Sequence, residues 1–478
     1  MSRWNRKLWA LILAAGMTVS LAACGGNDQA AGGASAGTQD GTAAQQNQST
    51  GSNIDNAGSI VTLAQDARAL QIIDDNYRTY YELFVYSFYD SDGDGIGDLQ
   101  GVLDKLDYLN DGDDTTDTDL GINGIWLMPV MPSTTYHKYD TTDYENIDPQ
   151  YGTLDDFQKL LTACHDRGIR VILDLAMNHS SSSHPWFQQA AEYLKNLPEG
   201  AEPDSSECPY IDYYHFSREA QSGYAQVNGA DWYYEARFWD GMPDLDLQNE
   251  EVRREFEQVA DFWLDMGVDG FKLDAGDPCY YHAGDKLFRD VSTDELSRLW
   301  AEFGEQFAFN ELRVCFRAGG YSLMQRLCDK QTKWDESGIA GLIPDTLLQG
   351  LTGHPFGSPD MIGGGEYTCF LNGNENACTP EMFVRYAQIA ALMPVMQFSA
   401  SPWRVLPEAD FQKVKAALAL REKCLPEIFK AVECAKVTGE PIARSMEFVF
   451  PGQGMERVMD QFMVGDALLV APVWKQGE

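Results

Sequence analysis

The sequence predicts an α/β protein: a (β/α)8 TIM barrel with a lobe inserted after the third strand and an incomplete C-terminal β-domain. Short apolar runs that end in polar residues alternate with amphipathic stretches whose apolar positions recur at helical spacing. Such alternation indicates a parallel sheet. Asp, Asn, His and Trp gather where the predicted strands end, which is where a closed barrel carries its chemistry. An open doubly wound sheet stays the second interpretation, although no GxGxxG follows the first strand.

The N-terminal segment predicts export. Three basic residues, Arg3, Arg6 and Lys7, precede an apolar run that is shorter than the roughly 20 residues of a membrane span. The ending LAAC resembles the bacterial lipoprotein box, which implies a signal peptide over residues 1–24 and a lipid on Cys24. We therefore expect an exported protein, anchored by lipid to the extracytoplasmic face of the cell membrane. Ordinary secretion with an incidental cysteine stays open.

The composition divides the rest of the chain. Residues 25–59 hold almost no large apolar side chain and predict a flexible linker, because such a segment cannot bury enough surface to fold. We expect the barrel over residues 60–420, with the lobe at 180–240 and a β-domain that starts at 421–478 and is not completed by Glu478. The cysteines after Cys24 form no CxxC pairs, so no zinc site is predicted, while one or two disulfides stay open.

The charge of the chain limits its partners. A formal net charge of -38 disfavours nucleic acid and anionic lipid, since surfaces that bind phosphate are basic. Neutral substrates suit this composition better. We therefore expect no nucleic-acid partner, and contact with the membrane through the lipid anchor only.

Four apolar runs are predicted to be buried strands of the first half: LFVYSFYD, GINGIWLMPV, GIRVILDLAMNH and MGVDGFKLDAG. The last run ends in Asp274, with Asp277 three residues later. Cleavage of a glycosidic bond needs one carboxylate at the sugar's reactive carbon and a second, protonated one at the leaving oxygen. Asp274 is the leading candidate nucleophile, and a helix-capping Asp is the structural alternative.

Polar residues also follow the third run. Three of them lie at or after its end: Asp174, Asn178 and His179. Such side chains can form hydrogen bonds with sugar hydroxyls. A role for His179 at the rim without ligand contact is equally open. Aromatic residues near these loops offer apolar faces to sugar rings, but most aromatic residues of any chain belong to the core. They are Trp126, Tyr139, Trp232, Tyr233, Trp239 and Trp403.

The Gly-rich segment DSDGDGIGD predicts a cation site. Asp90, Asp92, Asp94 and Asp98 bring hard oxygen ligands toward one point, as Ca²⁺ requires. The segment is not an EF-hand, because Gly101 occupies the twelfth position in place of Glu. A solvated acidic turn without metal is the alternative.

From about Tyr80 to Asp274 the chain resembles the α-amylase family, glycoside hydrolase family 13. The motifs are DSDGDGIGDLQG, GINGIWLMPVMPS, YHKYDTTDYENIDPQYGT, DLAMNH, MPDLDLQN and GVDGFKLD, in that order. The resemblance implies Asp274 as nucleophile and a calcium site that adds the carbonyl of Ile96 to the four aspartates. It also implies sugar contacts from Tyr139, Asp140 and His179.

The chain departs from that family at two places. Lys272 stands where the family carries Arg, which replaces a bidentate fork with a point charge, and we expect Lys272 to contact substrate in its place. The family's acid Glu has only a poor counterpart in Glu305.

From about Val268 to Glu478 the chain resembles glycoside hydrolase family 31, the α-glucosidase family. The resemblance lies in GFKLDAGDPCYY, NELRVCFRAGGYSLMQRLCDKQTKW, GLIPDTLLQGLTGHPFGSPDMIGGGEYTCF, MPVMQFSASPWRVL and the segment from ARSMEFVF to LLVAPV. It again implies Asp274 as nucleophile, with Asp329 as acid/base and Arg317 and Asp360 near the sugar. The two halves meet near residues 250–270.

The two resemblances imply a retaining glycosidase that hydrolyses O-glycosyl compounds. Its expected substrate is an α-glucan or oligosaccharide, and Ca²⁺ is its expected structural cofactor. Two other readings stay open: a lipid-tethered sugar-binding protein without turnover, and a misassembled product without a stable fold.

Overall fold

The structure is a computed structural model that describes residues 78–113, 115–116, 118–274, 298, 301–304, 311–312, 319–321, 323–365 and 377–478. The predicted signal peptide, the linker and Cys24 lie outside these residues. Within the described part, no helix is both long enough and apolar enough to cross a membrane. Six cysteines of this part carry free thiols: Cys164, Cys208, Cys328, Cys378, Cys424 and Cys434.

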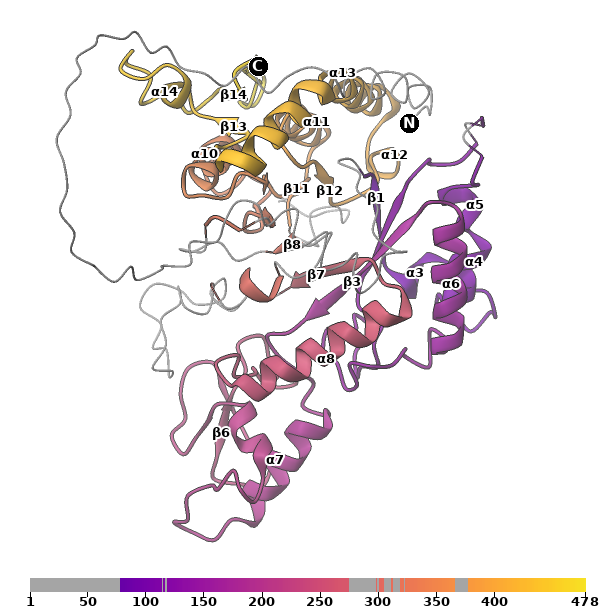
Figure 1. Ribbon diagram of the computed structural model, residues 1–478, viewed down its shortest axis with the longest axis vertical. Helices are drawn as coiled ribbons and strands as arrows, with labels where there is room; N and C mark the ends of the chain where they lie inside the picture. Colours follow the sequence, from indigo (N-terminus) through magenta and orange to yellow (C-terminus); the bar gives the residue numbers. More distant parts are fainter. Residues whose placement is uncertain are drawn as a thin grey trace, which may run out of the picture.

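A parallel sheet forms the centre of the molecule (Figure 1). Its seven strands follow one another in the order β1-β2-β3-β7-β8-β9-β10, and each neighbouring pair is parallel. Every residue of β2 and β3 is buried, as expected for strands covered on both faces. The strands are β1 (Tyr80–Leu83), β2 (Gly124–Leu127), β3 (Arg170–Ala176), β7 (Gly270–Asp274), β8 (Glu311–Leu312), β9 (Met324–Arg326) and β10 (Gly357–Ser358).

An eighth strand position completes the order. β11 (Met361–Ile362) follows β10 after a break at Asp360, and it pairs in parallel with β12 (Gln397–Phe398). Gln397 Nε2 of β12 donates to Glu82 Oε2 of β1 at 3.4 Å, so the last strand lies beside the first. With β10 and β11 as one interrupted strand, the described residues supply the eight positions of a (β/α)8 barrel, and the predicted fold class is confirmed.

Helices cover the outer face of the sheet, and their sequences explain why they form. In α6 (Leu154–Asp166) the buried residues Phe157, Leu160, Leu161 and Cys164 recur at helical spacing, and Thr153 and Asp156 close a capping box at its start. In α8 (Glu250–Met266) the buried face ends at Gly267, whose φ of 111° terminates the helix.

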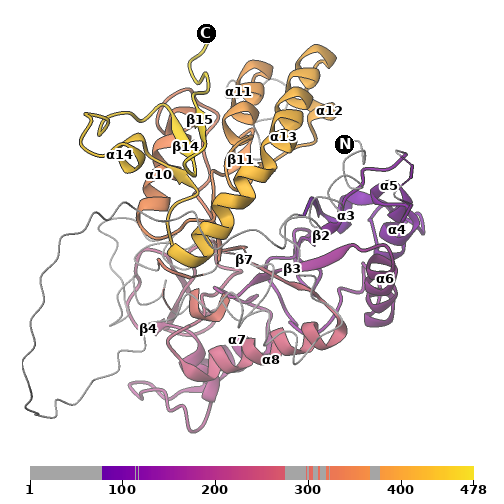
Figure 2. The same ribbon diagram turned by 45° about the horizontal axis from the view of Figure 1, so that its top comes forward.

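The helices group along the chain (Figures 1 and 2). In Figure 1 the indigo helices of the first half lie on the right, and the orange and yellow helices of the last third lie at the top. The remaining helices are α3 (Val85–Phe88), α4 (Leu99–Asp104), α5 (Leu106–Leu109), α10 (Leu342–Leu351), α11 (Pro380–Ala390), α12 (Pro402–Val405), α13 (Glu408–Thr438) and α14 (Met446–Val449), with the 3-10 turn η4 (Ile339–Gly341) before α10.

A lobe is inserted between β3 and α8, as predicted, and lies at the bottom of Figure 1. It contains α7 (Pro185–Asn196), the 3-10 turn η2 (Pro209–Tyr213) and an antiparallel sheet in the order β4-β6-β5. The strands are β4 (Phe216–Ser217), β5 (Tyr224–Gln226) and β6 (Tyr233–Glu235).

The C-terminal part ends in an antiparallel sheet of β13 (Ala443–Arg444), β14 (Phe462–Val464) and β15 (Leu468–Val470). The domain boundary expected at residue 421 falls inside α13, because that helix continues to Thr438 before the first of these strands. The first strand also differs from the expected run. It ends at Leu83, and residues Val85–Phe88 of the run form α3, because a short apolar run suits a buried helix as well as a strand.

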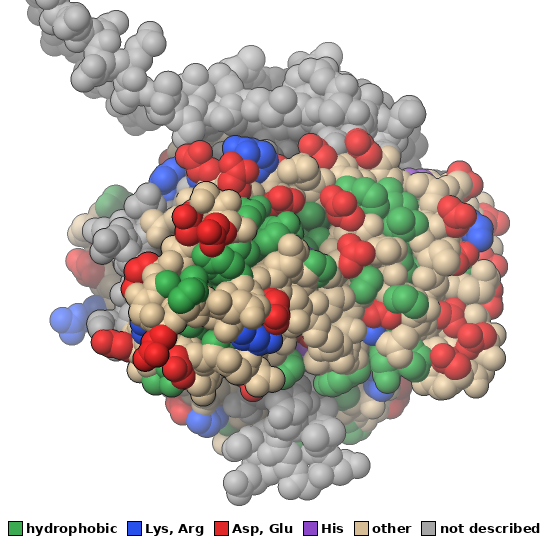
Figure 3. All heavy atoms as spheres, turned by 90° about the horizontal axis from the view of Figure 1, so that it is seen from below, with side chains coloured by type: hydrophobic (Ala, Val, Ile, Leu, Met, Phe, Trp, Pro, Cys, Tyr) green, Lys and Arg blue, Asp and Glu red, His purple; other side chains and the backbone are tan. Residues whose placement is uncertain are grey.

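The surface is acidic, as the net charge requires. Asp and Glu side chains are scattered over the face seen in Figure 3, with fewer Lys and Arg among them.

Candidate active site

Asp174 and Lys272 form the buried polar centre of the site. They lie opposite each other on β3 and β7, and Lys272 Nζ is 3.2 Å from Asp174 Oδ2. Their side chains are 0% and 5% exposed, and the ammonium also lies 5.2 Å from the centre of the Trp126 ring. The lysine that replaces the expected arginine is therefore held by a carboxylate on the neighbouring strand.

Tyr139 and His179 join this centre from two loops. Tyr139 Oη donates to Asp174 Oδ2 at 3.0 Å, and His179 Nε2 lies 3.2 Å from the carbonyl oxygen of Tyr139. The backbone of His179 is fixed in turn, since its carbonyl accepts from Tyr144 Oη at 2.7 Å. The structure thus brings together three predicted substrate-binding residues, Tyr139, His179 and Lys272, around Asp174.

Asp140 is buried among hydroxyl groups. Its carboxylate accepts from Ser133 Oγ, Thr134 Oγ1 and Thr135 Oγ1, and from Thr134 N at 3.1 Å. Burial alone would raise the pKa of Asp140, but these hydrogen bonds outweigh it and lower the pKa. The sugar contact of Asp140 stays a prediction; in this structure its side chain is 0% exposed and holds the loop around Tyr139.

Lys138 fixes the backbone just before Tyr139. It is 1% exposed, and its Nζ lies 2.7 Å from Asp148 Oδ2 and 2.6 Å from Gln150 Oε1. Its φ of 65° lies in the left-handed region, where a side chain costs about 1–2 kcal/mol. The buried ion pair stabilises this turn.

Arg326 connects two of the predicted acids. Its Nη1 lies 2.5 Å from Asp360 Oδ1 and 3.0 Å from Asp329 Oδ1. Asp360 is buried, its φ is 88°, and its Oδ2 accepts from Lys330 N at 2.6 Å. Burial raises the pKa of Asp360, although Arg326 opposes the shift.

Asp329 is the more accessible of these two acids, with 46% of its side chain exposed. Gly365 packs directly against it, so that a Cβ at residue 365 would collide with the Asp329 side chain. Asp360, by contrast, is buried and accepts from the same Arg326 Nη1. It is therefore placed to support Asp329 through Arg326.

Asp274 is the last residue of β7, paired with Ala176 of β3. Asp329 follows β9, which is separated from β7 by β8 alone. Because parallel strands end at the same edge, both acids belong to the C-terminal edge of one sheet. Arg317, Asp277 and Glu305 lie outside the described residues.

The acidic turn before α4 brings three of its carboxylates together. One oxygen each from Asp90, Asp92 and Asp98 lies within 4.8 Å of the others. Asp94 is not part of this group, and its Oδ1 accepts from Ile96 N at 2.7 Å. Hydrogen bonds from Gly95 N and Gly93 N lower the pKa of Asp90, so its carboxylate is ionised.

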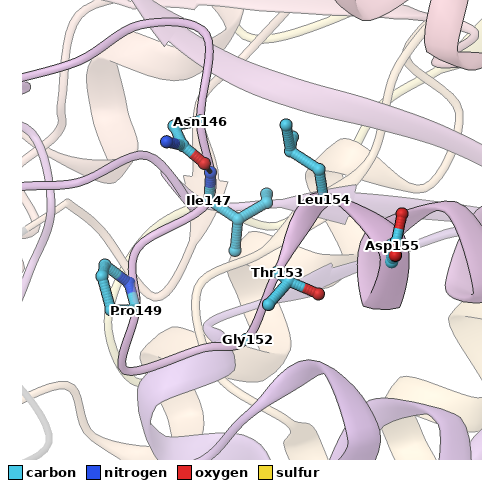
Figure 4. A pocket seen from close by; sticks show the side chains of 7 residues that line it. All are labelled: Asn146, Ile147, Pro149, Gly152, Thr153, Leu154 and Asp155. Carbon is cyan, nitrogen blue, oxygen red and sulfur yellow. Dashed lines mark hydrogen bonds between the residues drawn. The ribbon is translucent and has the colours of Figure 1, made fainter.

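The predicted aromatic residues are divided between core and surface. Trp126 and Trp232 are buried, whereas Trp239 and Trp403 are 44% and 47% exposed. A shallow depression, shown in Figure 4, lies elsewhere, between the turn at Asn146–Pro149 and the start of α6. Its lining residues belong to the loop and the cap of α6, and none of them is a predicted site residue.

Comparisons with known proteins find two family models in the chain. Residues 82–311 match the family model described as alpha amylase, catalytic domain. This segment is similar to the alpha-amylase family. Residues 439–478 match the model of the glycosyl hydrolase family 31 C-terminal domain, so both predicted resemblances are confirmed and the amylase segment is joined to a family 31 segment.

Individual curated relatives match less than half of the chain. Alpha-amylase 3 of Dictyoglomus thermophilum is 45% identical over 206 residues, which are 42% of this chain and 37% of that protein. Oligo-1,6-glucosidase of Parageobacillus thermoglucosidasius is 37% identical over 208 residues, 41% of this chain and 34% of that protein. The chain thus spans about a third of the length of these curated relatives.

A solved structure, Eubacterium rectale Amy13B, aligns over more of the chain. It has a TM-score of 0.54 and 40% identity, and the alignment covers 69% of this chain and 66% of that one. The likeness supports the barrel seen in the sheet order.

Two residues of the site were not singled out from the sequence. Arg326 joins Asp329 to Asp360, and Lys138 fixes the turn before Tyr139. The feature that could have indicated Arg326 is its charge within a short apolar run, since a buried charge usually has a partner. Lys138 gave no signal, because a lysine in a loop is ordinarily exposed.

Proposed function

We propose that the chain is a retaining glycosidase of carbohydrate metabolism that hydrolyses α-glycosidic bonds of oligosaccharides or polysaccharides. In this proposal Asp274 attacks the anomeric carbon, and Asp329 protonates the leaving oxygen and then activates water. The glycosyl-enzyme bond formed in the first step is broken in the second, so the configuration of the sugar is retained.

One observation carries the proposal: the two acids follow strands that are two positions apart at the same edge of one sheet. Neighbouring strands are about 4.8 Å apart, so β7 and β9 are about 10 Å apart. The proposal requires the two carboxyl groups to be roughly 5–5.5 Å apart, the separation of a retaining pair. Tyr139 and Lys272 contact Asp174 of β3, the strand next to β7, and His179 contacts the Tyr139 carbonyl. In the proposal these three residues bind sugar hydroxyls.

The test distinguishes the roles of the two acids by comparing a substrate whose leaving group needs a proton with one whose leaving group does not. Asp274→Asn is expected to abolish hydrolysis of both maltooligosaccharides and α-glucosyl fluoride. Asp329→Asn is expected to lower the rate of maltooligosaccharide hydrolysis about 10²–10⁴-fold. The rate with α-glucosyl fluoride should fall much less, because fluoride leaves without a proton. Asp335→Asn, in the same loop, is the matched control, because the Asp335 side chain accepts from Ser337 N and Oγ within its own turn.

A sugar-binding protein without turnover is the second candidate, and Lys272 favours it, since a point charge replaces a bidentate fork. Purified protein that binds maltooligosaccharides, releases no reducing sugar and is unchanged by Asp274→Asn would establish the second candidate and exclude the first.

Calcium is proposed as a structural ion at Asp90, Asp92 and Asp98, with Asp94 and the Ile96 carbonyl as further ligands. Ca²⁺–oxygen distances of about 2.3–2.6 Å place two ligands of one ion up to about 5 Å apart. The 4.8 Å limit on the three carboxylate oxygens fits that requirement. The ion would bind the turn that leads from α3 into α4.

The lipid anchor on Cys24 and the extracytoplasmic location are likewise proposals, supported by the LAAC sequence. Fractionation of cells that make the whole chain tests them. The unsubstituted protein is expected in the membrane fraction with incorporated labelled palmitate, and Cys24→Ser is expected to lose both. A Cys24→Ser protein that still carries the label would exclude the anchor.

A further inference from the structure

We propose that Asp360 is a positioning residue: through Arg326 and the backbone of Lys330, it fixes the carboxyl group of Asp329, the acid/base of the proposed function. This inference rests on that function, because it concerns how the acid is held. The buried Asp360 then acts through Asp329 and does not itself touch the substrate.

Asp360 contacts both the strand and the loop that carry Asp329. Its Oδ1 accepts from Arg326 Nη1 at 2.5 Å, and its Oδ2 accepts from Lys330 N at 2.6 Å. Asp329 lies between these two partners in the sequence, and its own Oδ1 is 3.0 Å from the same Arg326 Nη1. One buried carboxylate therefore fixes the chain on both sides of the acid.

The backbone at Asp360 is strained. Its φ of 88° lies in the left-handed region, where a side chain costs about 1–2 kcal/mol, and the break between β10 and β11 falls at this residue. Tyr386 Oη of α11 donates to the carbonyl of the preceding Pro359 at 3.4 Å. Strain of this kind persists only where the surroundings impose it, and it often marks a functional site.

Two glycines bring the segment after β11 against the loop of Asp329. Gly365 N donates to the Lys330 carbonyl at 3.0 Å, and a Cβ on Gly365 would collide with the Asp329 side chain. A Cβ on Gly364 would lie 2.8 Å from the same Lys330 carbonyl oxygen. The segment from Asp360 to Gly365 therefore packs along this loop and limits its movement.

The charges of this group leave Asp329 available to the substrate. The side chains of Arg326 and Asp360 are 5% and 0% exposed, so their opposite charges balance each other inside the protein. Asp329 meets the same guanidinium with 46% of its side chain exposed. Without Asp360, Arg326 would pair with Asp329 alone and draw the carboxyl group away from the leaving oxygen that it must protonate.

The experiment compares two substrates in the full chain, maltoheptaose and α-glucosyl fluoride, of which only the first needs a proton for its leaving group. Asp360→Asn removes the charge but keeps a side chain that tolerates a left-handed backbone. The kcat with maltoheptaose is expected to fall by up to about 10²-fold, because the acid is misplaced, while KM stays nearly unchanged. The rate with α-glucosyl fluoride is expected to change little.

A second variant and a control accompany this comparison. Arg326→Lys keeps a positive charge beside Asp360 but loses the planar group that orients two carboxylates, so the same selective loss is expected. It decides the matter if Asp360→Asn does not fold. Asp345→Asn is the control, because it removes the ion pair between Asp345 and the Lys330 side chain in the same loop without touching Arg326. Both rates of this control should stay as in the unsubstituted protein.

Two outcomes would overturn the inference. One is an equal loss of both rates in Asp360→Asn and in Arg326→Lys, since these residues would then support only the fold. The other is full retention of both rates in the two variants. The proposed function fails separately, and is recognised by Asp329→Asn, if that variant does not lower the maltoheptaose rate more than the fluoride rate.

Discussion

Lys272 and Asp174 face each other on adjacent strands, with the ammonium nitrogen 3.2 Å from a carboxylate oxygen and both side chains buried. Removing one partner of a buried pair leaves the other charge in a medium of low dielectric. We therefore expect Lys272→Met to lower the free energy of unfolding by about 3–5 kcal/mol. Urea denaturation measures this change.

The double variant Lys272→Met/Asp174→Asn is the control for that prediction, since it removes both charges together. It is expected to be more stable than Lys272→Met alone, because no isolated carboxylate remains. Additive losses in the two single variants and the double variant would show that the pair is not coupled.

Lys138 gives a prediction about backbone strain. Lys138→Gly and Lys138→Ala both remove the ion pair with Asp148, but only glycine adopts a φ of 65° without cost. The glycine variant is expected to be more stable than the alanine variant by about 1 kcal/mol. Thermal unfolding of the two proteins checks the difference, and an alanine variant of equal or greater stability would rule out strain at this turn.

His184 predicts a loss of stability in mild acid. It caps α7 by accepting from Trp186 N at 3.2 Å, and burial lowers its pKa from 6.5 to about 4. The unfolded chain takes up a proton on this residue below pH 6.5, whereas the folded chain does not until about pH 4. The free energy of unfolding is therefore expected to fall as the pH drops through this window, by up to about 3 kcal/mol.

The matched variant is His184→Asn, which keeps a capping side chain without a titrating ring. Its stability is expected to depend less on pH between 6.5 and 4 than that of the unsubstituted protein. Parallel pH profiles of the two proteins, measured by urea denaturation, would refute the assignment to His184.

Calcium removal is expected to destabilise the turn before α4. Chelation should lower the melting temperature of the unsubstituted protein, and added Ca²⁺ should restore it by mass action. Asp92→Asn should reduce this response, because Asp92 belongs to the carboxylate group. Asp104→Asn, further along in α4, is the control that should respond normally. An unsubstituted protein whose melting temperature does not change with chelator would exclude the ion.

The sequence predicted the parallel barrel because strand and helix patterns alternate over most of the chain, and it placed Asp274 at a strand end for the same reason. It did not predict which side chains meet. Asp140, expected to contact sugar, is buried among hydroxyl groups that follow β2, and Asp360 bonds to Arg326 through a left-handed backbone turn. Such pairings depend on the relative placement of loops from different strands, which local periodicity does not encode.

The first strand marks another limit. The run that begins at Leu83 is mostly apolar, yet Leu83 ends β1 and Val85 begins α3. Leu83 and Val85 are both buried, so burial does not separate the strand from the helix. Gly97 lies close to the Val85 carbonyl and Gly101 close to the Tyr89 carbonyl, and these contacts form only in the folded chain.

The hydrogen bond between Glu82 and Gln397 joins residues that are 315 positions apart. At a synthesis rate of about 5–20 residues per second, the ribosome needs roughly 15–60 s to pass from one to the other. During that interval the free edge of β1 has no neighbour to pair with, and closing so long a loop costs about 5 kcal/mol in chain entropy. The barrel can therefore close only after β12 has been synthesised, well before any sugar reaches it.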